Sequence, residues 1–255
     1  MVRKTSSPLT SIGLLFLLIV STTTVAKFIT RSTFITTRRA EATSSRLSLL
    51  AVLQAHKCSG NSHWKRFMQK GTLRYYPTFS TSSPNQLERK LNLSTDGPST
   101  RYESATLNIN QSYLLNGNTL VRTTFHAGTQ LEVKALDGLE AASIKFQMAT
   151  FGMLPILKRI SDPATTVVFV GNTANGNQFE VKTVNGFWYF YSDSEHLISR
   201  LEIGGITITF DDYRQVEGMN LPFHQNVSKG NVFLYEVQLD TVETNPMFDP
   251  GLFKT

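Results

Sequence analysis

Short strand-like segments separated by turn residues fill the last third of the sequence, and this spacing constrains the fold more than any other feature. The segments are rich in β-branched and aromatic residues, which favour extended structure. Pairs such as Asn175-Gly176 and Gly204-Gly205 lie between neighbouring segments and suit tight hairpin turns. Strands joined by such turns are antiparallel. The segments are "TTVVFVG", "QFEVKTV", "FWYFYSD", "HLISRLEI", "ITITFDDY", "PFHQNVS" and "VFLYEVQLDTVE".

Alternating residues also occur before this meander. Leu87, Leu91 and Leu93 fall on one face of a predicted strand, because successive side chains of a strand point to opposite faces. Apolar and polar residues alternate over residues 105–110 and predict another strand. An Asn-Gly pair at 116–117 predicts a hairpin turn.

Two segments have helical rather than strand periodicity. Leucines at three-residue spacing predict an amphipathic helix from about residue 47 to residue 57. Residues 138–162 predict a second helix, whose apolar surface extends around so much of its circumference that it should be buried on more than one side. Gly152 and Pro155 should kink this helix or divide it in two.

These elements predict one α+β domain over residues 41–255, in which about ten antiparallel strands form a sheet with helices against its concave face. Apolar residues make up 40% of the chain and charged residues 17%, which is a foldable globular composition.

The first 26 residues predict a secretory signal peptide, with a basic start, a short apolar core and small residues before a cleavage site after Ala26. The alternative is an uncleaved segment that anchors the protein to the inner membrane. The apolar core at residues 12–20 is shorter than the roughly 20 residues of a spanning helix, which favours the signal. Residues 27–40 predict a basic flexible leader. The expected location is therefore exported and periplasmic.

The charge distribution argues against a nucleic-acid partner. The formal net charge is +6, but residues 1–26 hold two basic and no acidic residues. Residues 27–46 hold five basic residues and one acidic residue, so the rest of the chain is neutral. A nucleic-acid-binding domain would carry its basic residues on the folded surface.

The stretch "FDDYRQVEGMNLPFHQ", residues 210–225, contains two aspartates, a glutamate and a histidine and is the strongest candidate for acid–base chemistry. Strand alternation places Asp212 on the same face as Phe210, and Asp211 on the opposite face with Tyr213. The two carboxylates should therefore diverge, unless a bulge intervenes. We interpret the stretch as two strands and their turn rather than a catalytic cluster.

Other motifs for catalysis or metal binding are missing from the sequence. It contains no His-Glu-x-x-His or Gly-x-Ser-x-Gly motif, and its five histidines are scattered. The single cysteine, Cys58, cannot form an intramolecular disulfide or a thiolate metal site by itself. The glycines in "GNTANGNQ", residues 171–178, indicate a hairpin between strands rather than a phosphate-binding loop. We predict no cofactor and no enzymatic activity, although an active site assembled from distant strands stays open.

The order of these elements and several phrases resemble one known family. The phrases are "KGTLRYY", "FWYFYSDSEHLISRLE", "FDDYRQVEGMNLPFHQ" and the C-terminal "ETNPMFDPGLF". They are similar to the bacterial lipoprotein-carrier superfamily, the LolA/LolB-like proteins, over about residues 40–254. The resemblance implies an incomplete, strongly curved antiparallel β-barrel that wraps around helices and holds acyl chains in an apolar hollow.

The expected function is an exported, non-enzymatic carrier or binding protein for acyl chains, lipids or lipoproteins in the cell envelope. Envelope membrane proteins would serve loading or release, and the carrier would be a monomer. The alternative is a protein-interaction or sensor module with the same fold and no lipid cargo. The residues expected to line the hollow are Phe146, Met148, Phe151, Met153, Trp188, Phe190 and Phe210.

Overall fold

The computed structural model describes residues 44–57, 65–75, 87–183 and 186–254, and the chain divides into two units, residues 1–47 and 48–255. In the first unit, residues 44–47 are helical. The predicted signal peptide and leader and the lone Cys58 lie outside the described residues. The second unit begins with helical residues 48–55 and contains the sheet.

Thirteen antiparallel strands form one open sheet in the described part of the second unit. Their order across the sheet is β6-β5-β4-β3-β2-β1-β13-β12-β11-β10-β9-β8-β7. The strands are β1 (Arg66–Tyr75), β2 (Leu87–Asp96), β3 (Ser99–Ala105), β4 (Ile109–Asn116), β5 (Thr119–His126), β6 (Thr129–Leu136), β7 (Thr166–Thr173), β8 (Gly176–Thr183), β9 (Gly186–Ser192), β10 (Ile198–Ile203), β11 (Ile206–Val216), β12 (Met219–Lys229) and β13 (Val232–Thr244).

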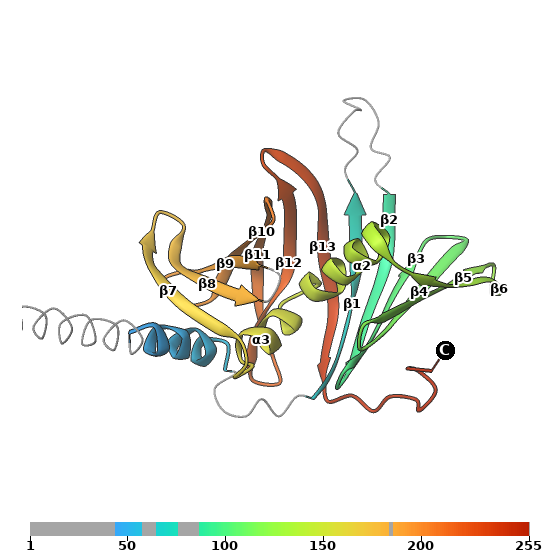
Figure 1. Cartoon of the computed structure of the whole chain (residues 1–255), viewed down its shortest axis with the longest axis horizontal. Coiled ribbons are helices and arrows are strands. Elements are labelled where there is room, and N and C mark those ends of the chain that lie inside the picture. The colour runs from blue at the N-terminus through green and yellow to red at the C-terminus, as the bar shows by residue number, and fades with distance from the viewer. Residues whose placement is uncertain (1–43, 58–64, 76–86, 184–185, 255) are drawn as a thin grey trace, which may run out of the picture. The chain divides into compact units, whose positions relative to one another are not determined.

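The path of the chain through this sheet determines where the middle helices lie. Strands β1 to β6 run outward to one edge, and the chain then crosses to the opposite edge at β7 before it returns strand by strand to β13. Helices α2 (Gly138–Thr150) and α3 (Leu154–Ile160) make this crossing. They therefore pass over one face of the sheet from edge to edge, and Figure 1 shows them lying across its central strands.

The number of strands corrects the sequence-based expectation of about ten. Residues 105–110 were expected to form one strand, but residues 106–108 form a turn between β3 and β4. The backbone N–H of Thr106 donates to the carbonyl oxygen of Ile109 at 2.8 Å, and Leu107 is fully exposed. Three alternating apolar residues are too short a signal to distinguish a strand from two strand ends around a turn.

The division of the middle helix confirms the prediction made from Gly152 and Pro155. Helix α2 ends at Thr150, Gly152 takes a left-handed φ of +70°, and Pro155 lies in the first turn of α3. The prediction that this segment is buried on more than one side is wrong for α2, in which only Ala141, Met148 and Thr150 are buried and Leu139 is 91% exposed. Helix α3 is buried more deeply. The buried residues of α3 are Leu154, Ile156, Leu157 and Ile160.

Candidate functional site

Two buried glutamines hold the junction between α2 and α3 against the sheet. The side-chain amide of Gln69, on β1, donates to the carbonyl oxygen of Phe151 at 2.8 Å. The backbone N–H of Gly152 donates to the side-chain oxygen of Gln225, on β12, at 2.9 Å. The glutamines are 1% and 4% exposed, so these hydrogen bonds form away from water. They satisfy backbone groups that the break in the helix leaves without helical partners.

The inner face of β7 to β12, which faces these helices, is lined by apolar side chains. Phe179 stacks on Phe190 with ring centroids 4.5 Å apart and planes 5° from parallel. Trp188 packs beside Phe190 at 6.2 Å, and Phe169 lies on the other side of Phe179 at 5.3 Å. These rings follow one another across neighbouring strands because their cross-strand registers pair Phe169 with Phe179 and Phe179 with Phe190.

The structure brings all seven sequence-predicted lining residues into this one apolar cluster. Six of them are buried, with exposed fractions of 6% or less, and Phe146 is half-buried against the same cluster. The residues are Phe146, Met148, Phe151, Met153, Trp188, Phe190 and Phe210. They belong to the packed hydrophobic core of the described structure, so their contact with a ligand stays a prediction.

Trp188 brings a polar atom into this apolar region. Its indole Nε1 is inaccessible to solvent and has no hydrogen-bond acceptor among the described residues. A buried donor without an acceptor costs about 1–3 kcal/mol. An oxygen atom of a bound molecule would relieve that cost.

His56, which the sequence left without a role, fixes the end of the first helical segment to the sheet. Its Nε2 accepts a hydrogen bond from the backbone N–H of Ile198 at 3.1 Å. Its Nδ1 lies 2.7 Å from the carbonyl oxygen of Asn220. Because Nε2 accepts, Nδ1 must carry the proton, and the ring is neutral. Burial lowers the pKa of His56, and the hydrogen bond to Asn220 partly offsets this effect.

The inner face becomes polar and aromatic on the other half of the sheet. Arg89, on β2, pairs in register with Leu73, whose side chain is in the core, so both lie on the inner face. The guanidinium of Arg89 lies over the ring of Tyr75, on β1, and Tyr235, on β13, lies against Tyr75. Two more tyrosines, Tyr102 on β3 and Tyr113 on β4, are close enough for the charge of Arg89 to lower their pKa values, although burial raises them more. Sequence analysis missed this group, although a signal was present. Position 89 lies on the same strand face as Leu91 and Leu93, where a charged residue interrupts the apolar pattern.

The stretch at residues 210–225 forms β11, its turn and β12, as expected, but one side chain is placed differently. Asp212 was expected to share the face of Phe210. Instead Asp212 has a left-handed φ of +54° and is exposed, and Tyr213 packs against the core. The left-handed residue breaks the alternation by rotating the following side chain inward. The hydroxyl of Tyr213 then donates to the carbonyl oxygen of Ile198.

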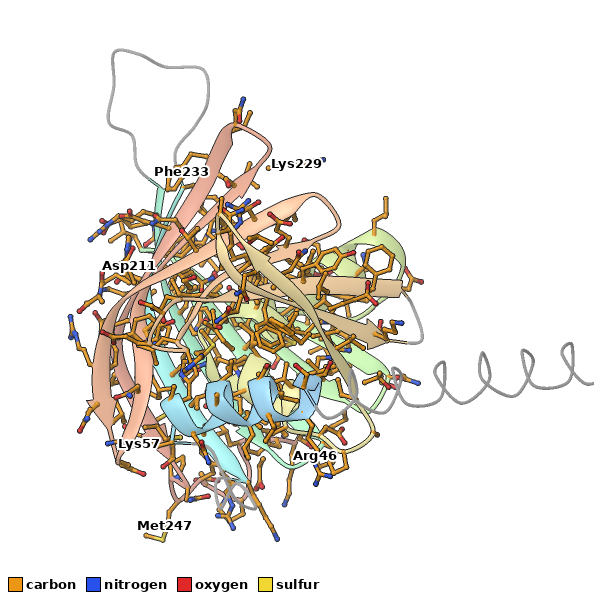
Figure 2. All side chains as sticks on the ribbon, turned by 90° about the vertical axis from the view of Figure 1, so that its left-hand side faces the viewer. Arg46, Lys57, Asp211, Lys229, Phe233 and Met247 are labelled. Atoms are coloured by element: carbon orange, nitrogen blue, oxygen red, sulfur yellow. The ribbon has the colours of Figure 1, made fainter. Side chains whose placement is uncertain are left out.

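The two aspartates bind different partners on the outer surface. Asp212 is bound by Arg214 through two hydrogen bonds of 2.6 and 3.1 Å, and this contact lowers the pKa of its carboxyl group. Asp211 Oδ1 lies 2.7 Å from Nδ1 of His224, whose other ring nitrogen is 3.5 Å from Glu236. Figure 2 shows Asp211 on the outer side of the sheet, away from the side chains that fill the interior.

Within the described ranges, no group of three or more His, Cys, Asp or Glu side chains is arranged to hold a metal ion. Nor does any helix described there have the length and apolar character needed to span a membrane. A pocket of about 330 Å³ lies beside the C-terminal segment, and its lining includes Arg66, Asp96, Phe248 and Phe253. None of the seven predicted lining residues contributes to it.

Comparison with solved protein structures identifies the fold of this chain, whereas comparison of its sequence does not. No protein-family model and no curated protein matches the sequence. A LolA superfamily protein from Nitrosomonas europaea superposes with a TM-score of 0.55 at 8% identity, covering 82% of this chain and 98% of that one. The chain has a LolA-like fold.

A DUF1329 family protein from Desulfovibrio piger shares the LolA-like fold of this chain. It superposes with a TM-score of 0.56 at 7% identity, covering 82% of this chain and 97% of that protein. The resemblance that the sequence phrases suggested is therefore confirmed at the level of fold. At identities this low, the likeness concerns the arrangement of strands and helices and not the chemistry of the interior.

Proposed function

We propose that this chain is a non-enzymatic carrier or binding protein that holds an acyl chain between its sheet and helices α2 and α3. The observation that carries the proposal is the apolar inner face of β7 to β12, on which aromatic side chains succeed one another beneath the crossing helices. Transfer of a fatty chain from water to such a surface is favourable by about 0.8 kcal/mol for each buried methylene group.

The way α2 and α3 are held gives a route for a ligand to enter. In the described structure the seven predicted residues belong to the packed core, so an acyl chain would have to separate the helices from the sheet or repack the side chains between them. Met148 and Met153 lie at this interface, and methionine side chains adapt to new neighbours with little strain. The buried hydrogen bonds of the helix crossing lie at its middle, at Gln69 and Gln225. The bonds nearer its ends, from Lys145 to Asn118 and from Lys158 to Gly97, are exposed. In this proposal the exposed bonds break and each end moves about the buried middle.

The LolA-like fold supports the same function. In this proposal the protein is exported to the periplasm, works as a monomer without a cofactor, and exchanges lipid or lipoprotein cargo with membrane proteins of the envelope. The N-terminal 26 residues act as its export signal. Fractionation of cells that express the full chain tests the location, because a retained anchor would leave the protein in the inner-membrane fraction.

Analysis of the protein as isolated from its own envelope tests the cargo. The full chain is purified under mild conditions and analysed by native mass spectrometry. Lipid or lipoprotein bound in stoichiometric amount supports the carrier. A protein that is consistently free of lipid, and that fails to take up added acyl chains, overturns it.

A second candidate is a protein-interaction or sensor module of the same fold. The observation that favours it is the exposed edge strand β6, where Leu131 and Val133 are 65% and 55% exposed. Exposed apolar residues on an edge strand can pair with a strand of another protein. Stoichiometric envelope proteins without lipid in the same native mass spectrum would favour this module over the carrier.

A further inference from the structure

Arg89 is a positive charge on the inner face of the sheet. Its cross-strand partner Leu73 is 3% exposed, and Leu91, two residues along the same strand face, is also 3% exposed. The neighbouring arginine on β1, Arg74, lies on the outer face and binds Glu88 and Glu236 at 2.8 and 3.1 Å. Strand β1 therefore carries Arg74 paired with carboxylates on the outer face, whereas strand β2 carries Arg89 on the inner face.

No carboxylate neutralises Arg89 among the described residues. Its Nε is inaccessible to solvent and has no hydrogen-bond partner there, and no described Asp or Glu lies within ion-pair distance. Among the described arginines, the others without a carboxylate partner, Arg46 and Arg159, are exposed. The connection between β1 and β2, residues 76–86, contains no acidic residue. A guanidinium group does not lose its proton, so this charge persists at any physiological pH.

The tyrosines around Arg89 offer hydrogen-bond donors but no negative charge. The guanidinium lies 5.6 Å from the ring centroid of Tyr75, and the ring of Tyr75 lies 5.7 Å from that of Tyr235. Burial raises the pKa of Tyr235 and of Tyr102, so both stay protonated. The hydroxyl of Tyr102 donates to Gln147, whereas those of Tyr75 and Tyr235 have no acceptor among the described residues.

We propose that Arg89 binds the anionic oxygen group at the head of an acyl-chain ligand, whose tail lies along the apolar inner face. The ring of Tyr75 lies against the guanidinium and that of Tyr235 lies against Tyr75, so in this proposal their hydroxyl groups serve as further donors. This inference rests on the proposed function and adds the chemical class of its ligand: an amphiphile with a carboxylate or phosphate head. A planar guanidinium can hold two oxygens of either head at once, and a partly buried ion pair is strongest where water is excluded.

Three probes that share a sixteen-carbon chain separate the head from the tail: hexadecanoate, hexadecyl phosphate and hexadecanol. Their dissociation constants are measured by calorimetry with the delipidated full chain, below the concentration at which the probes aggregate. We expect the tighter-binding anionic probe to bind with about ten- to a hundredfold higher affinity than hexadecanol, which is the range expected for hydrogen bonds between charged groups. The anion that gains more identifies the head as a carboxylate or a phosphate.

Arg89→Met keeps the reach of the side chain and removes its charge, so it should bind all three probes with nearly the affinity of hexadecanol. Arg74→Met is the matched control on the outer face and should keep the preference for anions. Arg89→Gln serves the same purpose should Arg89→Met not fold. An unchanged preference in the Arg89 variants overturns the inference but leaves lipid binding intact. If the wild-type protein binds none of the probes, the proposed function itself fails.

Discussion

We expect the buried His56 to make the stability of this protein depend on pH. His56 is fully buried, and its neutral ring bonds Ile198 and Asn220 through both nitrogens. A second proton on Nε2 would replace the acceptor of the Ile198 N–H with a competing donor. Since burial lowers the pKa of His56 in the folded protein, the unfolded chain binds a proton more readily than the folded chain. The stabilisation of the folded protein by the neutral ring of His56 is therefore complete above about pH 6.5 and is lost as the pH falls below that value.

His56→Gln should remove this pH dependence along with part of the stability. The substitution breaks the hydrogen bonds of the ring and should lower the free energy of unfolding at pH 7.5 by about 1–3 kcal/mol. Urea unfolding of both proteins at pH 7.5 and 5.5 gives the change. The wild-type protein should lose stability between the two values, whereas the variant should lose much less. His126→Gln, at an exposed position, is the control and should lose as much stability between the two pH values as the wild-type protein. If His56→Gln loses as much stability as the wild-type protein between the two pH values, His56 is not the group that causes the pH dependence.

The placement of some single residues could be predicted from the sequence, and that of others could not. The apolar residues of the interior follow from strand and helix periodicity, because periodicity determines which side of an element a residue occupies. Arg89 was detectable as a charge at an inward position, but whether its charge is paired depends on residues of other strands. The reversal at Asp212 and Tyr213 was not detectable, because an aspartate with left-handed φ is uncommon and nothing in the local sequence requires it.

At the scale of elements, the junction between α2 and α3 depends on the absence of a side chain at residue 152. Gly152 has a φ of +70°, and a Cβ there would overlap the side-chain amide of Gln69. That amide is itself fixed by its hydrogen bond to Phe151. A residue with a side chain must therefore strain the backbone and also displace the glutamine that anchors the crossing.

Gly152→Ala should consequently destabilise the protein more than an alanine at an ordinary left-handed glycine. Gly117→Ala is the matched control, since its φ is +56° but nothing lies within 4 Å of its added Cβ. We expect about 1 kcal/mol of destabilisation for Gly117→Ala, the cost of the backbone conformation, and about 2–4 kcal/mol for Gly152→Ala. Thermal or urea unfolding measures the stability of both variants. Equal losses of stability would show that the Gln69 side chain can move aside at no energetic cost.

The strands that the sequence predicted best are those that end at recognisable turn residues. Gly117, Gly204 and Gly218 lie at hairpin turns of the structure, where their positive φ angles suit glycine. The edge strand β6 escaped notice because all but its last residue are exposed on both faces, so burial imposes no alternation on its sequence. The order of the strands was also beyond local reasoning. That β1 pairs with β13 depends on contacts between residues more than 150 positions apart, such as Phe67 with Thr244.

At the scale of the whole molecule, the crossing helices link ligand binding to stability. An acyl chain between the sheet and α2–α3 would contact strands of both halves of the sheet, whereas the unfolded chain offers no comparable surface. Ligand binding should therefore raise the free energy of unfolding, by about 2.7 kcal/mol at a ligand concentration one hundred times the dissociation constant. For a domain of this size, that corresponds to an increase in Tm of about 5–10 °C.

Hexadecanoate added to the delipidated full chain should produce this increase in Tm, measured by circular dichroism. Butyrate is the control, because it carries the same carboxylate on a chain too short to bury much apolar surface, and it should leave Tm unchanged. Equal increases with the two acids would mean that charge alone stabilises the protein. No increase with hexadecanoate, in a protein that elutes without lipid, would mean that the aromatic interior is a closed core. The LolA-like fold would then serve the interaction module at its exposed edge strand.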